Sequence, residues 1–266
     1  MAINNKVFKY LIEGLQVKKG LLFVLIDPID HKDLNSCTKI AKIVSENGAD
    51  AILIGGSIGV QGKLLDDVVK NIKEVINVPV ILFPGNIGTI SQYADAIYFM
   101  SMLNSRSVYW VTTAQMQASL YIKSVNVEPL SVAYCVVEPG GTVGYIGDAN
   151  LIPRNKPQIA VSYAVMAQFL GFKFFLTDSG SNAPLPVSEE FVSIVSREIN
   201  IPYIVGGGIK TSEQAYNLIK AGADILQIGT AFENLDDIQK IKDRVIQFSK
   251  AIKEAGKTKK DKEYKV

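Results

Sequence analysis

Histidine and cysteine are scarce in this chain, and their scarcity excludes several kinds of site. Among 266 residues there is one histidine, His31, and there are two cysteines, Cys37 and Cys135. So few residues cannot build a Cys/His metal site with the usual ligand spacing. Both cysteines lie in apolar, periodic segments, so we expect buried thiols in a reducing cytosol rather than a disulfide. We expect His31 in a surface loop.

An excess of one charge and long apolar runs are also missing. The formal net charge is +2, and no basic helix interleaved with aromatic residues occurs, so we expect no nucleic acid partner. No apolar run approaches the roughly 20 residues that cross a bilayer, and the N-terminus lacks the apolar region of a signal peptide. We therefore expect a cytoplasmic protein without a transmembrane segment. Its length fits one α/β barrel, which typically takes about 250 residues.

Short apolar runs alternate along the chain with amphipathic segments. The runs predict eight strands, at 21–26, 51–54, 79–83, 96–100, 131–137, 173–176, 202–205 and 225–228. Helical spacing predicts a leading helix that could plug a barrel floor, and further helices between most strands. The exception is the connection after the third strand, whose segment 87–95 is too short and too polar for a full crossover helix.

Strands that alternate with helices predict a parallel sheet, because crossovers between parallel strands are right-handed. The predicted fold is a (β/α)8 TIM barrel, with the crossover helix after the third strand reduced or missing. An open, doubly wound sheet is the competing architecture, and the small-residue loops at the strand ends favour closure. We assign residues 1–256 to this one domain. The glycine-rich segment 138–155 predicts a lid or mobile edge, and the lysine-rich tail 257–266 predicts disorder.

Small residues follow three consecutive late strands. Glycine and small hydroxyl residues let main-chain N–H groups approach an anion, and a helix N-terminus behind them adds partial positive charge. Loops after late strands are also the usual phosphate site of a TIM barrel. The sequence therefore predicts a monophosphate cradle, although ordinary strand–helix turns use the same residue types. The predicted cradle consists of Ser179, Gly180, Ser181, Gly207, Gly208, Gly229 and Thr230.

Polar groups also end other strands. Asp27 follows the first strand and Ser57 the second, and a carboxylate with a hydroxyl suits Mg²⁺, which keeps waters and takes substrate phosphate oxygens. The alternative is that Asp27 caps the next helix and Ser57 spaces a turn. Thr177 and Asp178 end the sixth strand, where they could hold a substrate hydroxyl. Asp178 is the candidate general base, although an Asx turn or helix cap would use the same residue.

The sequence thus predicts two anion sites that face each other across one barrel mouth, one of them with a metal. Such a pair indicates group transfer between phosphorylated substrates. Trp110, beside Tyr109, lies at helical spacing from Ala114 and Gln117. An aromatic in that position is typical of a core or an interface, and it could also floor a pocket.

Six segments between about residues 21 and 233 form a recognisable set. They are Leu25-Ile26-Asp27-Pro28, Ala51-Ile52-Leu53-Ile54-Gly55-Gly56-Ser57, Ser101-Met102-Leu103-Asn104-Ser105-Arg106, Tyr109-Trp110, Val205-Gly206-Gly207-Gly208-Ile209 and Gly229-Thr230. The glycine triplet alone is common to many phosphate-binding barrels, whereas the segments together are specific. Together they resemble the geranylgeranylglyceryl phosphate synthase family, archaeal-type ether-lipid enzymes with heptaprenylglyceryl phosphate relatives in bacteria.

The resemblance implies transfer of a prenyl group from a diphosphate to the 3-hydroxyl of sn-glycerol 1-phosphate, the first ether bond of archaeal lipids. Asp27 and Ser57 match the family's Mg²⁺ positions, and the cradle matches its glycerol phosphate site. An aromatic at the position of Trp110 limits the prenyl chain in this family, which favours geranylgeranyl diphosphate as the donor.

One motif departs from the family. The family usually has Tyr-Leu-Glu at the end of the sixth strand, where this chain has Phe175-Leu176-Thr177-Asp178, all four of which would then belong to the glycerol phosphate site. Either Thr177 or, after a shift of one residue, Asp178 replaces the glutamate. We expect Asp178 to be the functional carboxylate. The tyrosine hydroxyl is missing in both alignments.

Two other functions compete with this interpretation. A phosphosugar isomerase or lyase barrel generally needs an acid–base pair or a Schiff-base lysine at its strand ends, and no lysine lies there. The altered sixth-strand motif would also suit a non-catalytic phosphate-binding relative. The region from Arg106 to Leu120 mixes apolar and polar side chains, from which we expect a homo-oligomer, either a dimer or a hexamer.

Overall fold

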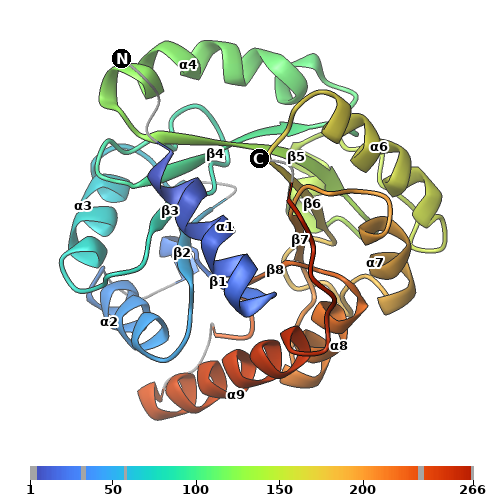
Figure 1. Ribbon diagram of the computed structural model, residues 1–266. Helices are drawn as coiled ribbons and strands as arrows, with labels where there is room; N and C mark the ends of the chain where they lie inside the picture. The colour runs from blue at the N-terminus through green and yellow to red at the C-terminus, as the bar shows by residue number, and fades with distance from the viewer. Residues whose placement is uncertain (1–4, 31–33, 57–58, 233–236, 265–266) are drawn as a thin grey trace.

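The computed structural model describes residues 5–30, 34–56, 59–232 and 237–264. Within these ranges, eight parallel strands close into a barrel in which each strand pairs with its neighbours in sequence (Figure 1). The predicted TIM barrel is therefore confirmed. The strands are β1 (Leu21–Ile26), β2 (Ala51–Ile54), β3 (Val80–Leu82), β4 (Ala96–Met102), β5 (Glu128–Val136), β6 (Phe174–Asp178), β7 (Tyr203–Gly206) and β8 (Ile225–Ile228).

Helices surround the barrel in Figure 1. None of residues 83–95 is helical, so the crossover helix after β3 is missing, as the sequence predicts. Before helix α8 (Ser212–Ala221), Thr211 and Gln214 form a capping box, in which the side chain of each bonds the other's main chain. The helical segments are α1 (Lys6–Lys18), η1 (Pro28–Asp30), α2 (Leu34–Glu46), α3 (Gly62–Lys73), η2 (Tyr109–Thr113), α4 (Ala114–Val125), α5 (Gly141–Ile146), α6 (Pro157–Phe169), α7 (Glu189–Ser196), α8 (Ser212–Ala221) and α9 (Ile238–Gly256).

Helix α5 lies in the segment 138–155, for which the sequence predicts a lid or mobile edge. The segment is instead tied to the barrel, because Gly140 donates to the carbonyl of Ser179 and Val137 bridges to Ile152. The chain enters α5 through two glycines with positive φ, at 80° and 52°. Glycine tolerates positive φ, and it also interrupts the apolar spacing by which a helix is predicted. This explains why the sequence indicated a loop where the structure has helix α5.

Strand residues alternate between two apolar layers. One layer lies between the strands and the surrounding helices, and the other fills the barrel interior. Helix α1 belongs to the inner layer: its Phe8 ring meets Phe174 edge-on at 5.6 Å between centroids. Figure 1 shows α1 lying across one end of the barrel, so it plugs the floor, the end at which the strands begin.

One hydrogen bond recurs three times at the floor. An aspartate directly before β2, β4 and β8 accepts a main-chain N–H from the preceding strand at 2.8–2.9 Å. The pairs are Asp50 with Leu22, Asp95 with Val80, and Asp224 with Tyr203. Each aspartate also pairs with a lysine, so the start of the strand pair is held by a charge-assisted bond.

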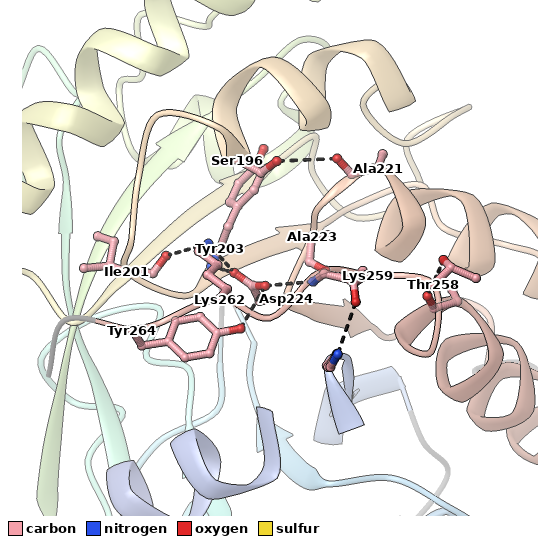
Figure 2. Close-up of polar contacts among 12 residues, drawn as sticks. Ser196, Ile201, Tyr203, Ala221, Ala223, Asp224, Thr258, Lys259, Lys262 and Tyr264 are labelled. Carbon is pink, nitrogen blue, oxygen red and sulfur yellow. Dashed lines mark hydrogen bonds and ion pairs between the residues drawn. The ribbon is translucent and has the colours of Figure 1, made fainter. Parts of the chain in front are cut away.

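The chain end completes the third of these sites (Figure 2). Asp224 is fully buried, and its two oxygens contact the ammonium groups of Lys259 at 2.8 Å and Lys262 at 2.9 Å. The hydroxyl of Tyr264 donates to the same carboxylate at 3.0 Å. The expectation of a disordered tail therefore needs correction for residues 257–264. Lysines that pair with a buried acid act as structural partners, which composition alone does not reveal.

Candidate active site

A cavity of about 130 Å³ opens at the barrel mouth, the end at which the strands terminate. Parallel strands bring their C-terminal ends together there, so residues from opposite sides of the barrel share one space. Seven of the residues that the sequence singles out line this cavity. They are Asp27, Asp178, Ser181, Gly207, Gly208, Gly229 and Thr230.

The other sixth-strand residues do not line the cavity. Because strand side chains alternate, the inward position of Asp178 turns Thr177 and Phe175 outward. The Thr177 hydroxyl bonds that of Tyr203 at 2.7 Å, and Leu176 is buried in the barrel interior. These placements do not support Phe175, Leu176 or Thr177 as direct glycerol contacts. Ser179 and Gly180 are also buried and lie behind the cavity wall rather than on it.

Asp178 is the buried carboxylate of the mouth. The main-chain N–H of Gly180 donates to its Oδ1 at 2.7 Å, and the Tyr134 hydroxyl donates to its Oδ2 at 3.4 Å. Burial raises the pKa of Asp178 above its ordinary value, although both hydrogen bonds oppose the rise. Burial likewise raises the pKa of Tyr134, next to the carboxylate, so its hydroxyl keeps its proton. This carboxyl group can therefore accept a proton more readily than a solvated one.

Two glycines make room for this carboxylate. A Cβ at Gly206 would lie 3.3 Å from Oδ2 of Asp178, and one at Gly207 would lie 2.6 Å from Oδ1. Gly207 also has φ of 81°, which side chains other than glycine rarely adopt. The glycines at the end of β7 thus leave space for the acid and also present bare main chain.

Arg154 holds the loops behind the cradle. Its guanidinium donates to the carbonyls of Glu138 at 3.1 Å and Leu185 at 3.3 Å, and also to that of Pro186. The Leu185 carbonyl in turn abuts Gly208, where an added Cβ would lie 2.5 Å away. The cradle is therefore fixed from behind by a side chain to which sequence reasoning assigned no role.

Asp27, one of the two predicted Mg²⁺ ligands, lies at the mouth after β1. Its Oδ1 accepts the N–H of Ile29 at 3.2 Å and lies 3.1 Å from an ideal Cβ on Gly56, so the carboxylate sits beside the glycine turn after β2. Ser57, the second predicted ligand, and His31 lie outside the described residues. Among the described residues no three histidines, cysteines or acids form a metal cluster. A single described carboxylate on this side of the mouth is compatible with Mg²⁺, which needs few protein ligands when a substrate supplies phosphate oxygens.

An apolar cavity adjoins the mouth. Its volume is about 60 Å³, and Pro84, Met100 and Tyr134 line both cavities. Trp110, in the π-helical segment η2, lines this second cavity together with residues of β4 and α4. The two cavities thus share part of their wall, and the second, which we call the apolar groove, is lined mostly by apolar side chains.

Sequence reasoning missed two polar strand residues of the mouth. Tyr134 lies in β5 and Gln227 in β8, and both point into the barrel within runs that look like ordinary core strands. Gln227 carried a usable signal, because it is the polar residue of a four-residue strand that is otherwise aliphatic. Tyr134 carried none, since tyrosine is common in buried strands.

Comparison with known proteins agrees with this geometry. The model of the PcrB family matches residues 16–248. Geranylgeranylglyceryl phosphate synthase of Pyrococcus horikoshii is 50% identical over 91% of this chain and 94% of its own length. The solved synthase of Thermoplasma volcanium is 39% identical, with a TM-score of 0.89 over 93% of this chain and 98% of its own. The Thermoplasma acidophilum enzyme, solved with its substrate sn-glycerol-1-phosphate, is 38% identical, with a TM-score of 0.87 over 92% and 98%. These matches confirm the resemblance found in the sequence, and this chain belongs to the PcrB family.

Proposed function

We propose that this protein transfers a geranylgeranyl group from geranylgeranyl diphosphate to the 3-hydroxyl of sn-glycerol 1-phosphate. The observation that carries the proposal is the mouth itself, where the buried carboxylate of Asp178 and the glycine cradle face Asp27 in one cavity. The apolar groove that adjoins this cavity suits a prenyl chain. The relatives' names and the glycerol phosphate complex of the Thermoplasma acidophilum enzyme support the choice of substrates.

The phosphate of the acceptor lies against main-chain N–H groups after β7 and β8, at Gly207, Gly208 and Gly229. Bare amides and partial helix charges bind a dianion without a positively charged side chain. The remaining three carbons of the acceptor then point toward the strand ends, where Asp178 lies. This orientation brings a terminal hydroxyl to the carboxylate.

Asp178 acts as the general base. Its carboxylate accepts the proton of the 3-hydroxyl while the hydroxyl oxygen bonds to C1 of the prenyl group and the bond from C1 to the diphosphate oxygen breaks. The proton passes to solvent when product leaves. A base with a raised pKa is better matched to this task than a solvated aspartate. Tyr134 holds the carboxylate through its hydroxyl.

Asp27 would bind Mg²⁺ together with the donor's diphosphate. When bound, Mg²⁺ neutralises charge on the departing diphosphate. Asp27 lies in the same cavity as Asp178, so donor and acceptor meet there. Magnesium dependence predicts that removing divalent ions with a chelator abolishes transfer and that adding Mg²⁺ restores it.

Trp110 limits the length of the prenyl donor. The indole lines the apolar groove and packs edge-on against Tyr109 at 4.9 Å between ring centroids. Replacement by alanine would lengthen the groove, so Trp110→Ala should accept donors longer than twenty carbons. Unchanged donor selectivity in this variant would show that another residue sets the chain length.

The decisive experiment is transfer from labelled geranylgeranyl diphosphate to sn-glycerol 1-phosphate in the presence of Mg²⁺. We expect a labelled ether product with the wild-type protein and none with Asp27→Ala. Absence of product with every prenyl donor would leave the non-catalytic phosphate-binding relative as the better account.

A phosphosugar isomerase or lyase is the weaker alternative. None of the described residues that line the mouth cavity is a lysine, so a Schiff-base mechanism lacks its nucleophile there. The apolar groove would have no use with a small sugar phosphate.

We also propose that the protein forms a homo-oligomer. Apolar side chains are exposed around α4, α5 and α6. Among the described residues, no helix is long and apolar enough to span a bilayer. Large exposed apolar patches mark contact surfaces. The most exposed of the apolar side chains around these three helices are Val108, Met116, Leu120, Tyr145, Phe169 and Leu170. Light scattering should give the mass of a dimer or hexamer for the wild type and a smaller mass for Leu120→Glu.

A further inference from the structure

Gln227 is a buried polar residue without an evident structural role. It lies in β8, is 4% exposed and lines the mouth cavity. Its side-chain amide oxygen has no hydrogen-bond partner among the described residues. A buried amide oxygen left unpaired lowers stability, because it loses its hydrogen bonds to water and gains none in return. Nearly all buried polar groups in proteins have partners, and because this one lines the mouth cavity, a ligand bound there could supply the partner.

The strand register places Gln227 at the level of Asp178. Both residues are paired with Gly206, Asp178 on the β6 side and Gln227 on the β8 side. Gly206 has no side chain, so nothing from β7 stands between the two polar groups. Adjacent strands lie about 4.8 Å apart, which puts the two Cα atoms roughly 10 Å from each other. A small polyol fits this gap.

The other neighbour of Gln227 offers no polar group. On the β1 side it pairs with Phe23, a fully buried member of the barrel interior. The amide is thus enclosed by an aromatic residue on one side and bare glycine on the other. A hydrogen-bond partner for the amide would therefore have to lie in the mouth cavity.

We propose that Gln227 binds a hydroxyl of the acceptor's glycerol, opposite Asp178. Gly207 follows this layer directly and Gly229 lies two residues after Gln227, so a phosphate bound there would direct its glycerol toward Gln227 and Asp178. An amide can both donate to and accept from a hydroxyl, which suits a neutral polyol. Gln227 is then a substrate-binding residue that selects glycerol phosphate over bare phosphate. This role rests on the proposed function.

The test is a calorimetric titration of Gln227→Met, which keeps the side-chain length and removes the amide, with Gln227→Leu as a second variant. We expect sn-glycerol 1-phosphate to bind roughly 3- to 10-fold more weakly, the effect of one neutral hydrogen bond, while inorganic phosphate binds as in the wild type. In the transfer assay KM for sn-glycerol 1-phosphate should rise by a similar factor, and KM for geranylgeranyl diphosphate should not change. The melting temperature should stay equal or rise, because an unpaired buried oxygen is gone.

Thr89→Val is the matched control. Thr89 is fully buried, its hydroxyl also has no partner among the described residues, and it lines neither cavity. This variant should leave both affinities unchanged. Equal binding of sn-glycerol 1-phosphate by Gln227→Met and wild type would overturn the inference, and so would a parallel loss of inorganic phosphate binding. Failure of the wild type to bind glycerol phosphate at all would instead count against the proposed function.

Discussion

Two buried aspartates at opposite ends of the barrel have opposite surroundings. At the floor, Asp224 meets two lysines and a tyrosine from the chain end. Burial alone would raise its pKa, but Lys259 and Lys262 lower it below the ordinary value. At the mouth, Asp178 has no described lysine or arginine against it, and burial raises its pKa. The buried charge at the floor is neutralised by lysines, whereas the one at the mouth is poorly compensated, as the proposed general base requires.

The largest expected effect comes from removing the charge at the mouth. Asp178→Asn keeps the shape of the side chain but cannot take the proton, so we expect kcat to fall by about 10²- to 10⁴-fold, the usual contribution of a general base. Steady-state transfer assays measure the loss. Asp224→Asn, the same substitution at the floor, should keep kcat per folded molecule. Comparable activity of Asp178→Asn and wild type would remove Asp178 from the chemistry.

The second effect is a loss of stability at the floor. In the double variant Lys259→Met/Lys262→Met, the carboxylate of Asp224 stays buried without its counter-charges, which should lower the free energy of unfolding by about 3–5 kcal/mol. Chemical denaturation measures the difference. Lys260→Met changes an exposed neighbour in the same tail and should have little effect. An equally small effect of the double variant would mean that the tail does not stabilise the barrel.

The smallest effect, and the sharpest contrast, is in the pH dependence of stability. Asp224 has a lowered folded-state pKa, so its contribution is present above the unfolded pKa, near 3.8, and is lost as pH falls through the folded value. Asp178 has a raised pKa, so its contribution is present below about pH 3.8 and is lost as pH rises through the folded value. At neutral pH, Asp178→Asn should therefore melt at or above the wild-type temperature, and the lysine double variant below it.

Melting curves between pH 3 and 8 would test this contrast. Both differences from wild type should shrink toward the acid end, from opposite signs. Curves that shift in the same direction for both variants would show that the two carboxyl groups do not differ in the way that their surroundings indicate.

The sequence predicted the fold closely, because strand periodicity and small-residue strand ends are local signals. Strands β1, β2 and β8 have the predicted bounds, and the absence of a helix after β3 was also foreseen. Helix α5 was missed because its glycines break the helical pattern. The ordered tail was missed because the partner of Lys259 and Lys262 lies more than thirty residues earlier, at Asp224.

The site was predicted less completely. Cradle glycines and acids at strand ends can be identified from residue type and position, and seven of the predicted site residues do line the cavity. The direction of each strand side chain, into the barrel or toward the helices, is harder to infer. Alternation along the strand, counted back from an inward Asp178, would have placed Thr177 and Phe175 away from the mouth. Tyr134 and Gln227 lie within strands rather than after them. Whether they reach the mouth depends on which face of the strand points into the barrel, and the sequence does not specify this.

Titration of the two aspartate side chains tests this account most directly. Carbon-detected NMR of the carboxyl groups, assigned with Asp178→Asn and Asp224→Asn, gives both pKa values in one sample. The account predicts a pKa for Asp178 above 3.8 and a pKa for Asp224 below it. A pKa for Asp178 equal to or lower than that of Asp224 would contradict it.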